Sequence, residues 1–424
     1  MTKPARNVLH FSATDNEGGS GRSAYRIHNG LRELGWRSRM IVGTKVTRDP
    51  DVDTAHGGSR ALKWTGYLID KATRKAGLAY QWQPWGGRLR RHPWLNGADV
   101  IQLYNLHGGY FPIRLLPAMS RRAPLIWRLS DMWPMTGHCV YSGTCEKWTS
   151  GCGGCPIPGD YVELGIDTSA FLWRQKSRLY AKCDITIVAP SSWTERLARE
   201  SPLLGRFQVR RIPNGLDTRI FKPIPRQAAC EILHYDPAVK RILFVAHGLD
   251  DNPRKGGAYL MEALKHVGPL PGVELLLAGV GGESWENADL PIRVRRAGYV
   301  TDDRLMAALY SCADMIVVPS PVENLPNTLL EAMACGVPAV AFDTGGMADA
   351  VHDGVTGHLV RSGDAAALAA AIRQMLGGDG EQRARMGVES RRLIEREFSS
   401  EIQAERFAAL YDEIIDARGK GRAG

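Results

Sequence analysis

Short apolar runs alternate with segments of helical periodicity along the whole chain. This alternation predicts an α/β protein whose sheets are parallel and covered by helices on both faces. The strands predicted in the first half are 8–11, 39–43, 99–104, 125–129, 185–189 and 208–212. Those predicted in the second half are 241–246, 273–278, 294–299, 315–319 and 338–342. Two groups of strands predict two domains, as expected for 424 residues, with a boundary in the turn-rich segment 212–223.

Residues 60–95 do not follow this alternation. The segment has only one acid, Asp70, and combines four tryptophans with eight Lys and Arg residues. Tryptophan beside basic residues is typical of a membrane–water interface. The alternative is an insertion that packs its aromatic side chains on its own domain. Both interpretations are open at this point.

The net charge of +9 is unevenly distributed. Residues 1–200 carry 28 Lys and Arg against 16 Asp and Glu, whereas residues 201–424 carry 26 against 29. The first half is therefore expected to meet an anionic partner, such as nucleic acid, lipid headgroups or a phosphorylated substrate. The alternative is a basic surface that only aids solubility. No run approaches the roughly 18 apolar residues of a membrane helix, and no signal peptide is visible. We expect a cytoplasmic protein with reduced cysteines.

Two carboxylates, Glu323 and Glu331, flank a predicted helix start in the second half. The apolar run 315–319 is a predicted strand, Pro326 fits the first helical turn, and Asn324 is placed to cap it. Glu323 is thus expected in a strand-to-helix loop, and Glu331 more than a turn inside the helix. Ligands of open α/β sheets bind at this edge, and a helix N-terminus favours an anion.

Two further segments follow predicted strands and suit phosphate. Gly18, Gly19, Ser20 and Gly21 open a helix after the first strand, and glycines let backbone N–H groups approach a phosphate. The spacing is not the dinucleotide fingerprint, and a simple tight turn is the alternative. In the second half, Arg254 and Lys255 are suited to grip a phosphate.

The chain resembles retaining nucleotide-sugar glycosyltransferases of family 4, because four patterns occur in the order expected for that family. They are the Gly18–Gly21 segment, the Ile-Pro-Asn-Gly-Leu-Asp run 212–217, the Pro-Arg-Lys-Gly run 253–256, and the Glu323/Glu331 pair followed by two glycines at 345–346. The resemblance implies the GT-B fold, with two Rossmann-like domains whose parallel sheets face each other across a cleft. It implies an acceptor domain 1–213, to which a C-terminal helix 400–424 returns, and a donor domain 214–399.

The resemblance also implies roles for individual residues. Glu331 is expected to bind the ribose, Glu323 to lie near the donor sugar, and Lys255 to hold the diphosphate and support catalysis. His107 is expected to face the transferred sugar, with Asp131 as a further catalytic candidate. The remaining residues expected to contact the nucleotide sugar are Gly19, Ser20, Gly21, Gly248, Arg254, Tyr299, Val300, Asn324 and Leu325.

Two positions depart from the family pattern. Leu249 stands where the family usually has Arg, so Arg254 is expected to replace that grip on phosphate. Ser130-Asp131 stands where the family often has His-Asp, so a role of that histidine is absent. No cofactor is expected to be required for catalysis, because Arg, Lys and helix N-termini can stabilise the departing diphosphate without a metal.

Four cysteines, Cys139, Cys145, Cys152 and Cys155, are spaced C-x5-C-x6-C-x2-C. In a cytosolic protein this density favours a structural zinc site, in which His138 could replace one thiol. The alternatives are thiols packed as small apolar groups or a redox-sensitive pair. The surroundings resemble the subgroup of the family that builds bacterial exopolysaccharides such as colanic acid.

The expected activity is transfer of a hexose from a UDP- or GDP-sugar, with retention, to a saccharide acceptor. The expected acceptor is a lipid-linked oligosaccharide at the inner membrane face, where the protein would be peripheral. No nucleic-acid partner is expected. The rival interpretations are a sugar-nucleotide epimerase of the same fold and a catalytically silent sugar-nucleotide-binding partner.

Overall fold

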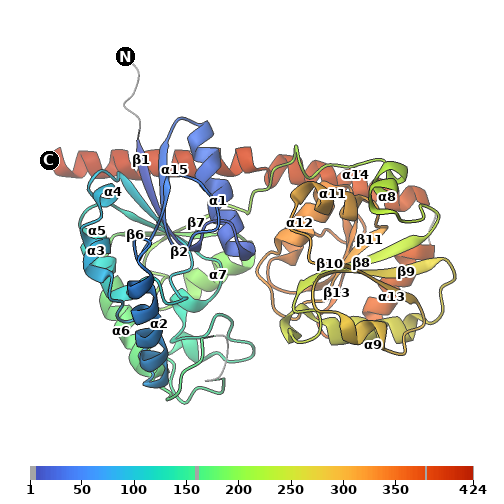
Figure 1. The fold of residues 1–424 in the computed structure, drawn as a ribbon, viewed down its shortest axis with the longest axis horizontal. Helices are drawn as coiled ribbons and strands as arrows, with labels where there is room; N and C mark the ends of the chain where they lie inside the picture. Colours follow the sequence, from blue (N-terminus) through green and yellow to red (C-terminus); the bar gives the residue numbers. More distant parts are fainter. Residues whose placement is uncertain (1–5, 158–161, 378–379, 424) are drawn as a thin grey trace. The chain divides into compact units, whose positions relative to one another are not determined.

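The computed structural model describes residues 6–157, 162–377 and 380–423 (Figure 1). The chain forms two compact units. The first comprises residues 1–215 and 400–424, and the second comprises residues 216–399. The expected division lay after residue 213. Each unit is built on its own parallel sheet with its own cores, so each positions its functional side chains independently.

The first unit has a seven-stranded sheet in the order β3-β2-β1-β4-β5-β6-β7, and every neighbouring pair is parallel. All six strands predicted for this half are present. The strands are β1 (Asn7–Thr14), β2 (Arg37–Thr44), β3 (Val52–Thr54), β4 (Val100–Leu103), β5 (Leu125–Arg128), β6 (Ile185–Ala189) and β7 (Gln208–Arg211).

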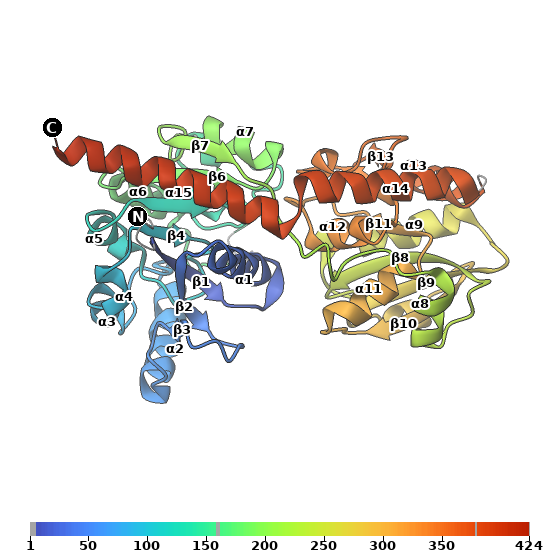
Figure 2. The ribbon, with the colours of Figure 1, turned by 90° about the horizontal axis from the view of Figure 1, so that it is seen from above.

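The helices of the first unit include its last element, α15, which packs against α1. Side chains of Phe407 and Tyr411 share a core with Ile27 and Leu31, and Figure 2 shows α15 running beside α1. The helices are α1 (Gly18–Glu33), α2 (Arg60–Lys75), α3 (Gly86–Arg90), α4 (Pro93–Asn96), α5 (Leu116–Ser120), α6 (Ser169–Tyr180), α7 (Ser192–Glu200) and α15 (Ser400–Ala423), with short 3-10 turns η1 (Ile113–Leu115), η2 (Trp133–Met135) and η3 (Lys147–Thr149).

The second unit has a six-stranded parallel sheet in the order β10-β9-β8-β11-β12-β13. All five strands predicted for this half are present. The strands are β8 (Lys240–His247), β9 (Val273–Val280), β10 (Arg293–Gly298), β11 (Met315–Val318), β12 (Ala339–Asp343) and β13 (Gly357–Arg361).

Helices cover both faces of the second sheet. Helices α9 and α13 pack in one core, and α8, α11, α12 and α14 pack in the other. Their bounds are α8 (Arg226–Leu233), α9 (Gly257–Val267), α10 (Glu283–Glu286), α11 (Asp303–Ser311), α12 (Asn327–Ala334), α13 (Ala365–Gly377) and α14 (Gly380–Glu397), with 3-10 turns η4 (Pro253–Lys255) and η5 (Met347–Asp349). Among the described helices, none has the length and apolar character needed to cross a membrane.

The α/β prediction with two parallel sheets is confirmed. The two strands that the sequence did not predict are the edge strands β3 and β13. Their sequences, Val-Asp-Thr and Gly-His-Leu-Val-Arg, are too short and too polar to give an apolar run. They pair because a neighbouring strand already offers an open edge, which is a tertiary effect.

Each sheet has one point at which the strand order reverses. In the first unit it lies between β1 and β4, and in the second between β8 and β11. Loops leaving the carboxyl ends of two such neighbouring strands diverge and leave a crevice, which is where open α/β sheets bind ligands. The candidate residues follow these strands in both units.

Candidate functional site

Lys255 and Glu323 form an ion pair at the reversal point of the second sheet. Lys255 ends η4, which follows β8, and Glu323 lies in the loop after β11. The Lys255 Nζ donates to Glu323 Oε2 over 2.6 Å. Only 12% of the Glu323 side chain and 25% of the Lys255 side chain are exposed. The two residues meet because β8 and β11 are hydrogen-bonded neighbours.

Two glycines hold the Glu323 loop from either side. Gly256 has φ 76°, and a Cβ built there would lie 1.8 Å from the Pro319 carbonyl oxygen. Gly345 has φ 57°, and its Cβ would lie 1.6 Å from the Glu323 carbonyl oxygen. Only glycine tolerates both the left-handed backbone and this close approach. The loop is therefore clamped by backbone contacts, which places the Glu323 carboxylate before any ligand arrives.

The environment of Glu323 keeps it ionised. Burial by itself would raise the pKa of the carboxyl group. The attraction and hydrogen bond of Lys255, the charge of Arg254 and the Asn324 N–H outweigh burial, and the pKa lies below its ordinary value. A carboxylate and two cations thus lie together at this reversal point, an arrangement that can bind a phosphate and still offer a negative group to a developing positive charge.

The start of the following helix differs from the prediction. Helix α12 begins at Asn327, so Pro326 is its N-cap residue rather than part of its first turn, and the cap has no side-chain hydrogen bond. Asn324 lies two residues before that N-cap, and its capping role stays a prediction. Its carbonyl accepts from the Gly346 N–H over 2.6 Å, and its own N–H donates to Glu323 Oε1 over 3.2 Å. This tie to the 345–346 turn keeps the chain extended through Pro326, which postpones the helix.

Glu331 lies on the fifth position of α12 and is 4% exposed. Its Oε2 accepts a hydrogen bond from the Tyr310 hydroxyl over 3.1 Å. The sequence did not single out Tyr310, because an aromatic residue in the apolar pattern of α11 is indistinguishable from an ordinary core residue. The ribose role of Glu331 stays a prediction.

The remaining candidates of the second unit lie at the carboxyl ends of β8 and β10. Gly248 has φ 74°, at the turn after β8. Leu249, the departure from the family pattern, is 6% exposed, and its carbonyl accepts from the Trp285 indole over 3.1 Å. It is therefore a packing residue. Tyr299 is 58% exposed and packs edge-on to a His247 ring 6.3 Å away, followed by the half-buried Val300.

In the first unit, His107 and Asp131 form a buried pair. His107 follows β4 and Asp131 follows β5, and these strands are neighbours in the sheet. The two side chains are 7% and 9% exposed. His107 Nε2 lies 2.8 Å from Asp131 Oδ2, and the Trp133 N–H donates to Asp131 Oδ1 over 2.9 Å. The carboxylate thus orients the imidazole, as expected for a polar group prepared to meet a substrate.

The glycine segment after β1 opens a helix as predicted, because α1 begins at Gly18. Gly21 is required there, since a Cβ would lie 2.0 Å from Thr14 Oγ1. Ser20 Oγ lies 2.9 Å from Ser130 Oγ, and Ser130 accepts from Arg128 Nη1 over 3.1 Å. Ser130 therefore connects the first turn of α1, which contains Gly19, to a buried arginine.

Lys176 is a buried cation that the sequence gave no reason to expect. Its Nζ donates to the carbonyl oxygens of Trp133 and Thr136 over 2.5 and 3.0 Å and lies 3.6 Å from the centre of the Trp133 ring. Burial lowers the pKa of Lys176 to about 7. In sequence it is one basic residue in an amphipathic helix, which normally faces water.

The four cysteines are free thiols, and all of them line a single pocket of the first unit together with His138. Across the described residues, no three His, Cys, Asp or Glu side chains stand together as a ready-made metal site. The zinc expectation stays a prediction.

Comparison with known proteins agrees with this geometry. Residues 239–377 match the family described as Glycosyl transferases group 1. The colanic acid biosynthesis glycosyl transferase named WcaC, from Escherichia coli (strain K12), is 25% identical over 79% of this chain and 82% of its own length. A phosphatidyl-myo-inositol mannosyltransferase of Mycobacterium leprae is 36% identical, over 40% of this chain and 44% of its own.

Solved structures share the fold over almost the whole chain. Anabaena HepE in complex with UDP-glucose has a TM-score of 0.65 at 17% identity, covering 96% of this chain and 99% of its own. WaaG, described as a glycosyltransferase involved in lipopolysaccharide biosynthesis, has a TM-score of 0.65 at 16% identity with the same coverage. At these identities the likeness concerns the fold, which is that of GT-B glycosyltransferases.

Proposed function

Since the chain contains a domain of the glycosyl transferases group 1 family on a GT-B fold, we propose that it transfers a hexose from a UDP- or GDP-sugar to a saccharide acceptor, with retention at the anomeric carbon. The observation that carries the proposal is the Lys255–Glu323 pair at the reversal point of the second sheet. The similarity to a colanic acid biosynthesis glycosyl transferase supports a role in exopolysaccharide or cell-surface polysaccharide synthesis.

In the proposed reaction the bond between the sugar C1 and the phosphate oxygen breaks, and the departing nucleoside diphosphate keeps the electron pair. Lys255 and Arg254 stabilise the charge gained by that group, as preorganised cations do in phosphate chemistry. Glu323 faces the positive charge that develops on the sugar. Glu331 holds the ribose and Tyr299 borders the base. The acceptor hydroxyl oxygen forms the new bond to C1, and its proton passes to the departing diphosphate.

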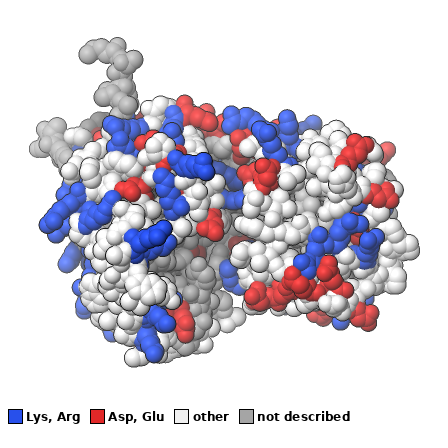
Figure 3. All heavy atoms as spheres, in the orientation of Figure 1, with Lys and Arg blue, Asp and Glu red and all other residues white. Residues whose placement is uncertain are grey.

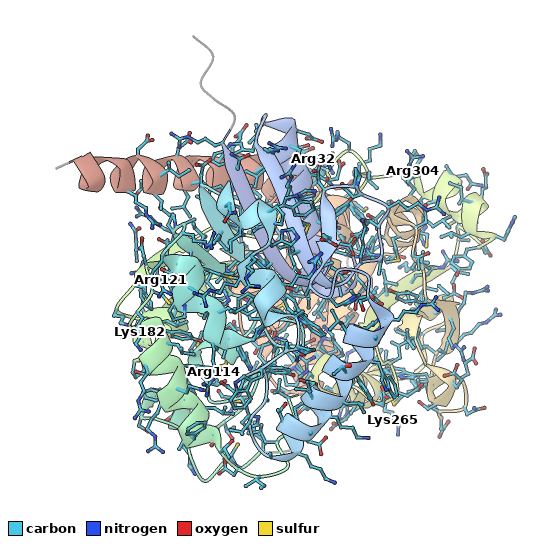
Figure 4. All side chains as sticks on the ribbon, turned by 60° about the vertical axis from the view of Figure 1, so that its left-hand side comes forward. Arg32, Arg114, Arg121, Lys182, Lys265 and Arg304 are labelled. Atoms are coloured by element: carbon cyan, nitrogen blue, oxygen red, sulfur yellow. The ribbon has the colours of Figure 1, made fainter. Side chains whose placement is uncertain are left out.

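We assign to the first unit the binding of the acceptor. The His107–Asp131 pair supports this assignment, because an imidazole held in place by a carboxylate can bond a hydroxyl group of a saccharide. The first unit carries 35 Lys and Arg against 21 Asp and Glu, a net charge of +14, whereas the second carries 19 against 24, a net of −5. Figure 3 shows this bias on the visible face. Exposed cations such as Arg114, Arg121 and Lys182 stand along one side of this unit (Figure 4). This charge suits an acceptor carried on a phosphorylated lipid.

Helix α2 is the proposed point of contact with an anionic lipid surface. Three large apolar side chains on it are exposed, Trp64 at 63%, Tyr67 at 52% and Leu68 at 48%. Exposed Lys63 and Lys71 flank them. Aromatic and basic residues on one amphipathic helix match an interface of headgroups and acyl chains in both polarity and charge. Elsewhere in segment 60–95, Trp85 is buried as a packing residue, so under this proposal the segment would combine both of the roles considered from sequence.

The donor site is tested by titrating UDP and GDP into wild type and Lys255→Ala, with calorimetric detection. Loss of one charge-assisted contact to phosphate is worth about 1.5–3 kcal/mol, so the variant should bind the preferred nucleotide roughly 10- to 100-fold more weakly. Lys265→Ala is the matched control, because Lys265 is an exposed residue on α9 (Figure 4). Equal affinity of Lys255→Ala and wild type would refute the assignment.

Turnover separates the proposed transferase from its rivals. UDP-glucose incubated without acceptor should remain UDP-glucose; conversion to another UDP-sugar would identify an epimerase. Glu323→Gln should reduce transfer to a saccharide acceptor by about 100-fold or more, the cost of losing a group that acts on developing charge. Unchanged transfer in both Glu323→Gln and Lys255→Ala would refute the proposed catalytic site.

A further inference from the structure

Two buried polar side chains of α6 are bonded to the backbone around the 3-10 turn η2. Lys176 and Tyr180 are four residues apart, so they lie on one face of the helix, and they are 4% and 0% exposed. The Tyr180 hydroxyl donates to the Pro134 carbonyl over 3.1 Å. Lys176 Nζ donates to the carbonyls of Trp133 and Thr136 over 2.5 and 3.0 Å. The turn and the residue that follows it are therefore fixed to α6 by hydrogen bonds to their backbone.

The same turn holds the carboxylate of Asp131. The Trp133 N–H donates to Asp131 Oδ1 over 2.9 Å, and Asp131 Oδ2 lies 2.8 Å from His107 Nε2. An ionised carboxylate only accepts, so the imidazole donates its Nε2 proton to Asp131. Trp133 thus accepts from Lys176 at its carbonyl and donates to Asp131 at its N–H. Hydrogen bonds therefore lead from Lys176, through the backbone of one residue, to the imidazole of His107.

Charge also connects Lys176 to Asp131. The groups that act electrostatically on the buried amine are the Cys139 and Cys152 thiols and the Asp131 carboxylate. Burial raises the pKa of both thiols, which keeps them neutral at ordinary pH. Asp131 is therefore the group of opposite charge among these three. Because a buried cation is costly unless an opposite charge lies near it, the positions of Lys176 and Asp131 are energetically coupled.

The Trp133 ring lies close to both ends of this path. Lys176 Nζ is 3.6 Å from the centre of the ring, and the centre of the His107 ring is 5.8 Å from it. Trp133 is 3% exposed and packs against the rings of Trp127 and Tyr80 as well. A closely packed side chain transmits a displacement to its neighbours instead of absorbing it.

We propose that Lys176 is a positioning residue for the His107–Asp131 pair and acts through the backbone and ring of Trp133. This role depends on the proposed bonding of a saccharide hydroxyl by His107, and Lys176 itself does not touch the saccharide. The carbonyls that Lys176 meets can only accept, so its amine group is a donor to them in either charge state. The simpler alternative is an anchor that stabilises the loop without acting on His107.

A double-mutant cycle on transfer separates these two roles. Lys176→Met removes the donors but keeps an unbranched side chain, so kcat for transfer should fall about 10- to 100-fold as the imidazole is displaced. Affinity for UDP or GDP should stay at the wild-type value, because the proposed donor residues lie in the second unit. With His107→Ala already present, Lys176→Met should reduce kcat by less than about twofold. An equal loss of kcat in both backgrounds would overturn the proposal.

Arg178→Met is the matched control, because Arg178 is an exposed basic residue on the same helix. This variant should leave both kcat and nucleotide affinity unchanged. If Lys176→Met does not fold, Lys176→Gln takes its place in the same cycle, since the glutamine amide can still donate to one carbonyl. The expected outcome and the contradicting outcome are then the same as for Lys176→Met.

A proton resonance of His107 tests the same role without turnover. An imidazole N–H bonded to a carboxylate resonates downfield of the backbone amides, and loss of the signal in His107→Ala identifies it. Lys176→Met should shift or broaden this signal, whereas Arg178→Met should not. An unchanged signal in Lys176→Met would contradict the positioning role. Absence of transfer by wild type, with the signal changed in Lys176→Met, would instead refute the proposed function alone.

Discussion

Individual residues in the second unit are constrained more by backbone contacts than by their side chains. A Cβ on Gly256 would overlap the Pro319 carbonyl oxygen, and one on Gly345 would overlap the carbonyl oxygen of Glu323 itself, so both positions require glycine. The position of the Glu323 carboxylate is therefore set by backbone atoms of two glycines, which take no part in the proposed reaction. Catalytic geometry of this kind is sensitive to substitutions that leave every charged residue intact.

Gly345→Ala tests this constraint. A left-handed alanine costs about 1–2 kcal/mol, and overlap with the Glu323 carbonyl adds roughly 1–3 kcal/mol. Gly354 has a similar φ of 73°, but a Cβ there would meet no atom within 4 Å. Gly354→Ala should therefore cost only about 1–2 kcal/mol, the cost of the left-handed backbone. Denaturant unfolding and UDP titration should separate them, with nucleotide affinity reduced in Gly345→Ala alone. Equal losses of stability and of nucleotide affinity in the two variants would show that the close approach of Gly345 to the Glu323 carbonyl has no special role.

The pKa of Glu323 makes a prediction about acid stability. Its folded pKa lies below its ordinary value of 4.5, so the carboxylate contributes stability that is complete above that value. The contribution is lost as pH falls through the folded pKa. Glu323→Gln does not titrate, so the difference in free energy of unfolding between wild type and variant should shrink on acidification from about pH 6 to about pH 3. A constant difference over this range would show that Glu323 has the same pKa folded and unfolded.

At the scale of elements, strand-to-helix connections do the functional work in both units. The residues of interest follow β1, β4 and β5 in one sheet and β8 and β11 in the other, and strand order brings their loops together. Helix α2 is an exception, since its residues of interest lie on an exposed face, with Trp64 63% and Tyr67 52% exposed. These two side chains stack on each other, with ring centres 5.7 Å apart.

Removing the exposed face of α2 should weaken membrane binding without unfolding the protein. In a variant with Trp64→Ala, Tyr67→Ala and Lys71→Ser, sedimentation with anionic vesicles should fall at least tenfold, because aromatic area and charge are lost together. Val388→Ala with Arg392→Ser on α14 alters comparably exposed positions in the second unit and should leave binding unchanged. Wild-type sedimentation by the α2 variant would mean that this helix does not meet lipid.

For the whole molecule, the division into two units assigns the nucleotide to one of them. A ligand at 100 times its dissociation constant stabilises the binding state by about 2.7 kcal/mol. UDP or GDP should therefore slow amide exchange in the second unit, most of all in segments 248–257 and 320–331, and leave the first sheet unchanged. Hydrogen exchange read by mass spectrometry measures both units at once. Protection confined to residues 8–130 would reassign the donor site.

The sequence by itself determined the class of fold and most of the candidate site. All eleven predicted strands are present, and the central ones are recognisable because burial on both faces of a parallel sheet produces a continuous apolar run. Lys255 and Glu323 were recognisable because each follows such a run. Only the tertiary structure decided their contact, since it depends on β8 pairing with β11, 75 residues along the chain from Lys240 to Met315.

Three other features also required the assembled chain. The edge strands β3 and β13 pair on an existing sheet rather than by their own hydrophobicity. The late start of α12 follows from the bond between Asn324 and Gly346. The buried ammonium of Lys176 is stabilised by carbonyl groups of a distant loop. In each case a contact between segments far apart in sequence decides the local structure. The periodicity of the local sequence cannot predict such a contact.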